Sequence, residues 1–146
     1  MAEQKNTTLG RTFYDSYNNR DFDQAVALCH KNLEWINVTS GETFRGPEGC
    51  RLFMEGWADG FPDSSVELRS LYTGNDVVVC EGVFRGTHTG PFVGPGGEIQ
   101  PTGRSVDTPF WQVHKIGDAK FVSCRLYFDA VTLMSQLGLM PTSEQA

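Results

Sequence analysis

The sequence predicts an α+β protein in which three helices of the N-terminal half pack on a strongly curved antiparallel sheet. Helical periodicity is concentrated in the first 61 residues, longer β-type segments follow, and one short helical pattern closes the chain. This order is typical of the α+β class. Three helices on one face of a bent sheet would form a cone. The 146 residues suit one domain spanning 1–146, with a core at about 7–139 and flexible ends.

Two helices are predicted first. Leu9, Phe13 and Tyr17 recur at i, i+4 and i+8, which is a helical spacing. The polar run "NNRD" breaks this helix, and Asn19 or Asp21 is suited to cap a second one. The apolar face of the second helix consists of Phe22, Ala25, Val26 and Cys29. We place His30 at its C-terminal end, where a cation suits the helix dipole.

A strand and a third helix come next. The run "LEWINV" alternates and predicts a strand, and Pro47 in "FRGPEG" fits the first turn of a helix. The apolar stripe of that helix is Cys50, Phe53, Met54, Trp57 and Phe61. Such a stripe more often belongs to a core than to a ligand-binding wall.

The second half predicts an antiparallel meander. Strands are expected in "SVELRSLYTG", "GNDVVVCEGVFRGTH", "GRSVDTPFWQVHKI" and "KFVSCRLYFD", with a hairpin turn at "GDA". Glycines at 82, 86 and 90 are candidate bulge positions that would bend the sheet. The Gly/Pro-rich segment 89–103 is either a flap over the mouth of the cone or a long hairpin loop.

A short C-terminal helix is expected after Asp129. Its apolar stripe is Ala130, Leu133, Met134 and Leu137. Gly138 is placed to end it, and Pro141 follows. The last five residues, "TSEQA", predict a frayed tail.

Composition excludes several function classes. The net charge of -6 disfavours binding to nucleic acid or anionic lipid. No window of 18 or more apolar residues predicts a membrane span, and the polar N-terminus lacks the apolar run of a signal peptide. Four scattered cysteines without a Cys-x-x-Cys pair predict buried thiols in a reducing, cytoplasmic compartment. The cysteines and three histidines show no metal-ligand spacing, so no metal site is expected.

The order of elements resembles the nuclear-transport-factor-two-like cone fold. Residues 90–139 more specifically resemble the C-terminal half of the SnoaL-like polyketide cyclase family. The motifs that carry this resemblance are "PTGR" opening a strand, the turn before "KFVSCRLYFD", and "QLGL" closing the helix. The resemblance implies a SnoaL-like domain with a pocket inside the cone. It does not by itself imply one activity, because this fold hosts several chemistries as well as non-catalytic binders.

Three acid or base positions of the superfamily are apolar or neutral here. Limonene epoxide hydrolase resembles the chain near "CRLYFD", and its catalytic Asp falls on Leu126. Its Arg and Asp of an earlier strand fall near Gly82 and Phe84. Ketosteroid isomerase places its base after the first strand, where this chain has Asn37 and no carboxylate.

Period-2 alternation assigns the faces of the sheet. If Leu126 points into the cone, Cys124 and Phe128 do too, while Arg125 and Tyr127 face outward. The residues predicted to bind ligand are Tyr14, Tyr17, Trp35, Asn37, Phe53, Trp57, Phe84, Thr108, Phe110, Gln112, Leu126 and Phe128. An aromatic content of 12% fits an apolar pocket, although a well-filled core explains it equally.

The outer face predicts a homodimer. Five residues of opposite parity would form an exposed apolar patch that monomers rarely tolerate: Val77, Val79, Val83, Trp111 and Val113.

Two residues are candidate acid/base groups. His88 titrates near neutral pH and is the best candidate base, although its place at a strand end equally fits a surface turn. Asp129 directly precedes the last helix, and we favour a helix cap over catalysis because a cap is needed there in any case. Asn37, Gln112 or a tyrosine would donate to a developing oxyanion.

The function expected from the resemblance is binding of a small hydrophobic molecule, polyketide- or steroid-like, in the pocket. The chain would either catalyse an acid/base cyclisation, isomerisation or hydrolysis without a cofactor, or serve as a non-catalytic binding or dimerisation module. A buried titratable group in the pocket would favour the enzyme.

Overall fold

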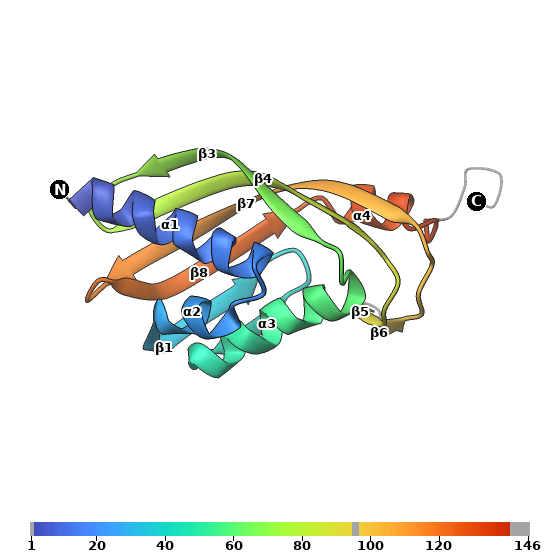
Figure 1. The fold of residues 1–146 in the computed structure, drawn as a ribbon, viewed down its shortest axis with the longest axis horizontal. Helices are drawn as coiled ribbons and strands as arrows, with labels where there is room; N and C mark the ends of the chain where they lie inside the picture. Colours follow the sequence, from blue (N-terminus) through green and yellow to red (C-terminus); the bar gives the residue numbers. More distant parts are fainter. Residues whose placement is uncertain (1, 95–96, 141–146) are drawn as a thin grey trace.

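The computed structural model describes residues 2–94 and 97–140, so the predicted tail and residues 95–96 of the predicted flap lie outside it. Helices α1 and α3 cover one face of a curved sheet, and α4 lies at the opposite end of the long axis from the start of α1 (Figure 1). The α+β cone expected from the sequence is confirmed.

The first two helices differ from expectation at their ends. Helix α1 (Ala2–Asn18) begins well before Leu9, the first residue of its predicted apolar stripe. Helix α2 (Phe22–Ala27) is capped by Asp21, whose side chain accepts from the Gln24 N–H at 3.1 Å. The prediction that Cys29 and His30 complete α2 is wrong, because both lie in β1 (Cys29–Asn37). Pairing with β8 replaces a further helical turn here, because Phe121 N–H donates to Leu28 O at 2.9 Å and Cys29 pairs with Phe121.

The other two helices match expectation. Helix α3 (Gly46–Gly60) carries Pro47 in its first turn, and Phe61 is its C-cap. Helix α4 (Ala130–Gln136) is followed by Gly138, which has a φ of 75°. A left-handed backbone at this point favours glycine.

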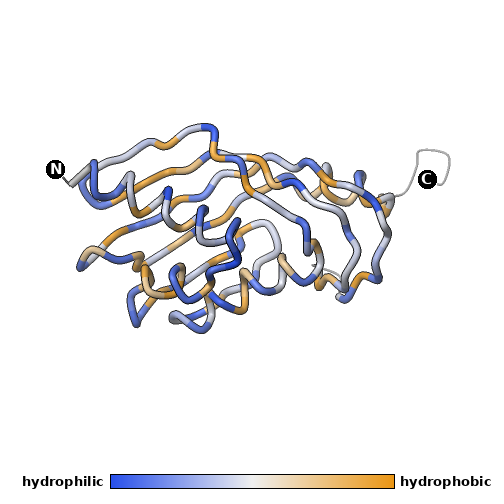
Figure 2. The backbone as a smooth tube through the Cα atoms, viewed as in Figure 1, coloured by the Kyte–Doolittle hydropathy of each residue, from blue (hydrophilic) through white to orange (hydrophobic). Residues whose placement is uncertain are grey.

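The six strands of the main sheet run in the order β2-β1-β8-β7-β4-β3. The four long strands of the meander occur as predicted: β3 (Ser65–Thr73), β4 (Val77–Thr87), β7 (Ser105–Gly117) and β8 (Lys120–Phe128). Their pairings are antiparallel, whereas β1 pairs with β8 in parallel. A two-residue turn, Asp118 and Ala119 with positive φ, connects β7 to β8. Hydrophobic and hydrophilic residues are interleaved along these strands (Figure 2).

Three short strands were not predicted. Strand β2 (Glu42–Arg45) pairs only with β1 at the sheet edge, and its burial pattern shows no clear alternation. Strands β5 (Phe92–Gly94) and β6 (Gly97–Ile99) form a separate hairpin within the segment 89–103. The hairpin lies beyond the C-terminal end of α3 (Figure 1). Runs of three or four residues are too short for a periodicity to emerge.

Gly82 in β4 and Gly90 beyond its end allow close packing rather than bulges. The register shift lies on β3, between Leu68 and Ser70, opposite Gly82. A Cβ at Gly82 would lie 2.6 Å from Glu67 O, and one at Gly90 would lie 1.9 Å from Asp59 O. Only glycine fits such contacts with neighbouring backbone. The expected bend is therefore accompanied by an irregularity in the strand facing Gly82.

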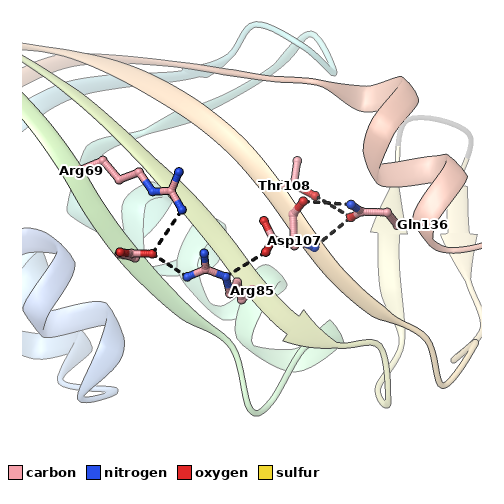
Figure 3. A network of polar contacts seen from close by, with 6 residues as sticks. Arg69, Arg85, Asp107, Thr108 and Gln136 are labelled. Carbon is pink, nitrogen blue, oxygen red and sulfur yellow. Dashed lines mark hydrogen bonds and ion pairs between the residues drawn. The ribbon is translucent and has the colours of Figure 1, made fainter.

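Helix α4 is fastened to β7 by one side chain. Gln136 Nε2 donates to Asp107 O at 2.9 Å, and Gln136 Oε1 accepts from Asp107 N–H at 2.8 Å (Figure 3). The Thr108 hydroxyl donates to the same Oε1 at 3.3 Å. Arg85 joins Asp107 to Glu67 through ion pairs. These bonds hold α4 at the end of the sheet.

Candidate functional site

An inner cavity lies between α1, α3 and the covered face of the sheet. Its volume is about 70 Å³. Its wall consists of Phe13, Tyr14, Tyr17, Phe53, Met54, Trp57, Val66, Phe84, Thr108, Phe110, Gln112, Leu126 and Phe128. Among these described residues, none carries a formal charge at neutral pH. The wall thus suits an apolar molecule with few polar groups.

A chain of four buried polar side chains reaches the cavity wall. The Tyr14 hydroxyl bonds to Gln112 Oε1 and lies 3.1 Å from His114 Nε2. His114 Nδ1 lies 3.0 Å from Cys124 Sγ. Tyr14 comes from α1, whereas the other three come from β7 and β8. Gln112 and His114 share a face because they are two residues apart on one strand.

Burial keeps these four side chains neutral. It lowers the pKa of His114 from 6.5 to about 3 and raises the pKa of Cys124 well above its usual value. Burial, together with the neighbouring thiols of Cys80 and Cys124, raises the pKa of Tyr14 well above 10. Desolvation penalises the charged form of each group. Tyr14, His114 and Cys124 therefore stay un-ionised near neutral pH.

One polar atom of these four side chains has no hydrogen-bond partner. Gln112 Nε2 is buried and makes no hydrogen bond within the described residues. A buried amide donor without an acceptor costs about 1–3 kcal/mol. Gln112 is also a residue of the cavity wall.

A larger outer cleft of about 460 Å³ lies beside the inner cavity. Its described lining combines apolar residues with Asn37, Ser40 and the carboxylates of Glu42, Asp59 and Glu98. The cleft is bounded by α3, the β1–β2 turn, the β5–β6 hairpin and α4. Its volume falls within the range of small-molecule sites, about 300–1,000 Å³.

Three aromatic residues separate the two spaces. Phe53, Trp57 and Phe128 line both the inner cavity and the outer cleft. Trp57 meets Phe128 edge to face, with ring centroids 5.5 Å apart, and it also contacts Phe92 of the hairpin at 4.8 Å. We call Phe53, Trp57 and Phe128 the aromatic partition.

The family can now be assigned. The model of the SnoaL-like polyketide cyclase family matches residues 7–137, most of the chain. This protein belongs to the SnoaL-like polyketide cyclase family. No curated protein sequence matches it.

Solved structures show the same fold. A protein from Jannaschia sp. CCS1, described as SnoaL-like, has a TM-score of 0.83 at 21% identity, with 95% of each chain covered. TsrD from Streptomyces laurentii has a TM-score of 0.81 at 26% identity, covering 94% of this chain and 97% of that one. A protein from Catenulispora acidiphila with a ketosteroid isomerase-like fold, in complex with trimethylamine, has a TM-score of 0.76 at 14% identity. In that comparison, 90% of this chain and 93% of that chain are covered.

Most residues predicted to line the pocket of this SnoaL-like protein do surround one space. The predicted residues in the inner wall are Tyr14, Tyr17, Phe53, Trp57, Phe84, Thr108, Phe110, Gln112, Leu126 and Phe128. Asn37 lies instead in the outer cleft, where its Oδ1 accepts from Ser40 N–H at 3.1 Å. Trp35 lines neither space, since it is fully buried between Phe13 and Phe53. Whether these residues bind a ligand stays a prediction.

His88 is buried, but it lines neither the cavity nor the cleft. Its ring packs on Phe61 at 5.2 Å, and its Nδ1 accepts from the Thr102 N–H at 3.2 Å. Burial lowers the pKa of His88, while its Nε2 has no partner within the described residues. The alternative of a surface turn residue is wrong, because the side chain is enclosed between α3 and the segment after β6.

Asp129 caps α4, as the favoured interpretation held. Its carboxylate accepts from the Thr132 N–H at 3.0 Å and from the Thr132 hydroxyl at 2.6 Å. These two bonds hold the pKa of Asp129 below its usual value. Asp129 is exposed and lines neither the inner cavity nor the outer cleft.

Five residues of the site were not among the predicted site residues, one of them Cys124, which contacts His114. Phe13, Met54 and Val66 complete the inner wall, and His114 lies behind it. His114 lies two residues after Gln112 and so shares its face of β7, but nothing local links it to Tyr14, which lies 100 residues earlier.

Proposed function

We propose that this SnoaL-like protein binds a small, mostly planar hydrophobic molecule that carries a carbonyl oxygen. The observation that carries the proposal is the buried, unpartnered Gln112 Nε2 in an uncharged, mostly apolar wall. A carbonyl oxygen placed there would accept its hydrogen bond while aromatic side chains contact the rest of the molecule. Polyketide- and steroid-like ketones have this character.

The ligand would occupy more than the inner cavity alone. A volume of about 70 Å³ is small beside a bicyclic ketone. The outer cleft offers about 460 Å³ on the other side of the aromatic partition. We therefore propose entry through the outer cleft and displacement of the partition, with the carbonyl end reaching Gln112.

Cofactor-independent acid/base chemistry is the catalytic form of this proposal. A donor aimed at a carbonyl stabilises the enolate formed when a proton leaves the adjacent carbon. Cyclisation of the aldol type and double-bond isomerisation both pass through such an enolate. His88 and Asp129 stay predicted acid/base groups, and motion would be needed to bring either to a ligand in the cavity.

Non-catalytic binding is the second candidate. It is favoured by the lack of any carboxylate or histidine among the described residues of the inner wall. A base with a pKa near the working pH is the usual requirement for rapid proton abstraction.

One experiment with 2-tetralone addresses both candidates. Binding should raise the melting temperature, because a ligand that binds only the folded state stabilises it. Leu126→Trp should remove this effect by filling the cavity, whereas Val131→Trp, at an exposed position on α4, should retain it. Stabilisation by nucleotides or sugar phosphates, with none by 2-tetralone, would contradict the proposal.

Proton exchange then separates catalysis from binding. In deuterated water, NMR should show faster exchange of the hydrogens next to the 2-tetralone carbonyl if the protein stabilises the enolate. Leu126→Trp is the matched control for this measurement. Binding without faster exchange would favour the non-catalytic candidate.

A further inference from the structure

The amide of Gln112 can present either a donor or an acceptor to the inner cavity. Its Oε1 is engaged by Tyr14, so Nε2 is the free end. The reverse orientation would place Nε2 on Tyr14 and turn Oε1 inward. Which end faces the cavity therefore depends on which groups donate and which accept in the hydrogen bonds among Tyr14, His114 and Cys124.

The direction is set at the far end of the chain, where Cys124 meets His114. A thiol sulfur is a weak acceptor, whereas the bare nitrogen of a neutral imidazole is a good acceptor. The favoured bond therefore runs from the Cys124 S–H to His114 Nδ1, across 3.0 Å. The ring is neutral, because burial lowers the pKa of His114 to about 3, and its single proton is then on Nε2.

The remaining bonds follow from this tautomer. His114 Nε2–H donates to the Tyr14 oxygen, 3.1 Å away. The only hydroxyl proton of Tyr14 is then free to donate to Gln112 Oε1, which is a better acceptor than the neighbouring sulfur of Cys80. Each of these groups donates its proton once, and the series of hydrogen bonds ends at the unpartnered Nε2 of Gln112.

We propose that His114 and Tyr14 are positioning residues that make the inner cavity select a hydrogen-bond acceptor and reject a donor of the same shape. This inference rests on the proposed function, because it concerns the selectivity of that cavity. The ligand class that it favours is a ketone or enolate without a donor group at the buried end. Neither His114 nor Tyr14 needs to transfer a proton for this role.

A matched pair of bicyclic molecules measures the selectivity. The five-membered ring of 1-indanone carries an acceptor oxygen, whereas that of indole carries an N–H donor. A donor opposite Gln112 Nε2 would leave both buried groups unsatisfied, which corresponds to at least about tenfold weaker binding. The dissociation constants would be measured by calorimetry or by ligand-observed NMR.

Tyr14→Phe is the decisive variant. It keeps the ring but removes the hydroxyl that holds Gln112 Oε1, so the amide is free to turn. We expect the ratio of the two dissociation constants to fall to about twofold or less, because either end of the amide can then serve the ligand. Tyr127→Phe, which removes a hydroxyl from the other face of the sheet, should leave the ratio unchanged.

The tautomer of His114 gives a second measurement that needs no folded variant. The ¹⁵N chemical shifts of the ring nitrogens, with signals assigned by backbone-linked experiments, should show a protonated Nε2 and a bare Nδ1. A proton on Nδ1 would overturn the inference, because the chain would then run in the reverse direction.

The binding outcomes separate the inference from the proposed function. Equal affinity of the wild-type protein for 1-indanone and indole would overturn the inference while leaving the ketone site standing. A ratio that survives in Tyr14→Phe would also overturn it. Failure of both molecules to bind would reject the proposed function, and the inference with it.

Discussion

The indole ring of Trp57 meets the phenyl ring of Phe128 edge to face, with centroids 5.5 Å apart and planes at 86°. This contact lies where the inner cavity and the outer cleft share a wall. A helix side chain and a strand side chain thus form this shared wall together. Because Trp57 is only half-buried, we expect a ligand to enter where Trp57 moves toward the cleft.

The first prediction tests this route. Trp57→Leu leaves a smaller side chain in the aromatic partition, so 1-indanone should reach the cavity faster. Stopped-flow measurements should give a higher association rate constant than in the wild-type protein. Trp111→Leu, on the other face of the sheet, is the control and should change little. An unchanged rate in Trp57→Leu would show that the ligand enters elsewhere.

The second prediction concerns Asp129. Asn caps a helix about as well as Asp, so Asp129→Asn should leave the free energy of unfolding nearly unchanged. Asp129→Ala should lower it by about 1 kcal/mol, because the bonds to Thr132 are lost. Urea unfolding measures both. A folded Asp129→Asn variant that binds 2-tetralone but loses any catalysed proton exchange would instead reveal an acid/base role.

The third prediction concerns pH. His114 has a pKa of about 3 in the folded chain and 6.5 when unperturbed, so the unfolded chain binds more protons between these values. The free energy of unfolding should therefore fall as the pH falls below about 6.5, by about 1 kcal/mol per pH unit from His114. His88, whose pKa burial also lowers, should add in the same direction.

Replacing His114 isolates its share of this pH dependence. His114→Gln should be less stable at neutral pH, since it breaks the bonds to Tyr14 and Cys124, but its stability should fall less steeply between about pH 6.5 and 5. Urea unfolding at several pH values measures the slope. Equal slopes in the variant and the wild-type protein would show that His114 is not protonated on unfolding in this range.

The strand pattern predicted the inner face well because inward- and outward-facing side chains alternate regularly along the parts of β7 and β8 that line the cavity. Thr108, Phe110 and Gln112 line the cavity together with Leu126 and Phe128. Trp35 has the expected parity, yet neighbouring aromatic rings cover it completely. Alternation identifies the face on which a side chain lies, but not which side chains of that face are covered by a helix.

The hydrogen bonds of Tyr14 to Gln112 and His114 could not be predicted from the sequence, for a different reason. Tyr14 meets Gln112 and His114 across 98 and 100 residues, and only the packing of α1 on the sheet brings them together. Likewise, no local pattern indicated that Asn37 would lie in a cleft apart from Gln112. Long-range pairs of this kind depend on the rotation and position of a helix, which periodicity does not determine.

The last prediction is a homodimer through the outer face of the sheet. Trp111 is 49% exposed and stacks on Tyr127, with centroids 5.3 Å apart and planes at 6°. Tyr72 is also exposed, whereas Val83 of the predicted patch is buried, so the patch is smaller than expected. Exposed aromatic residues of this kind are typical centres of protein interfaces.

Sedimentation at micromolar concentration should give about twice the chain mass of 16.2 kDa. Trp111→Glu should shift the protein to the monomer, because it places a carboxylate at the centre of the patch, where the dimer would bury it without a partner. Val131→Glu, at an exposed position on α4, should remain dimeric. A monomeric wild-type protein under these conditions would contradict the prediction. A dimer that Trp111→Glu leaves intact would place the interface on another surface.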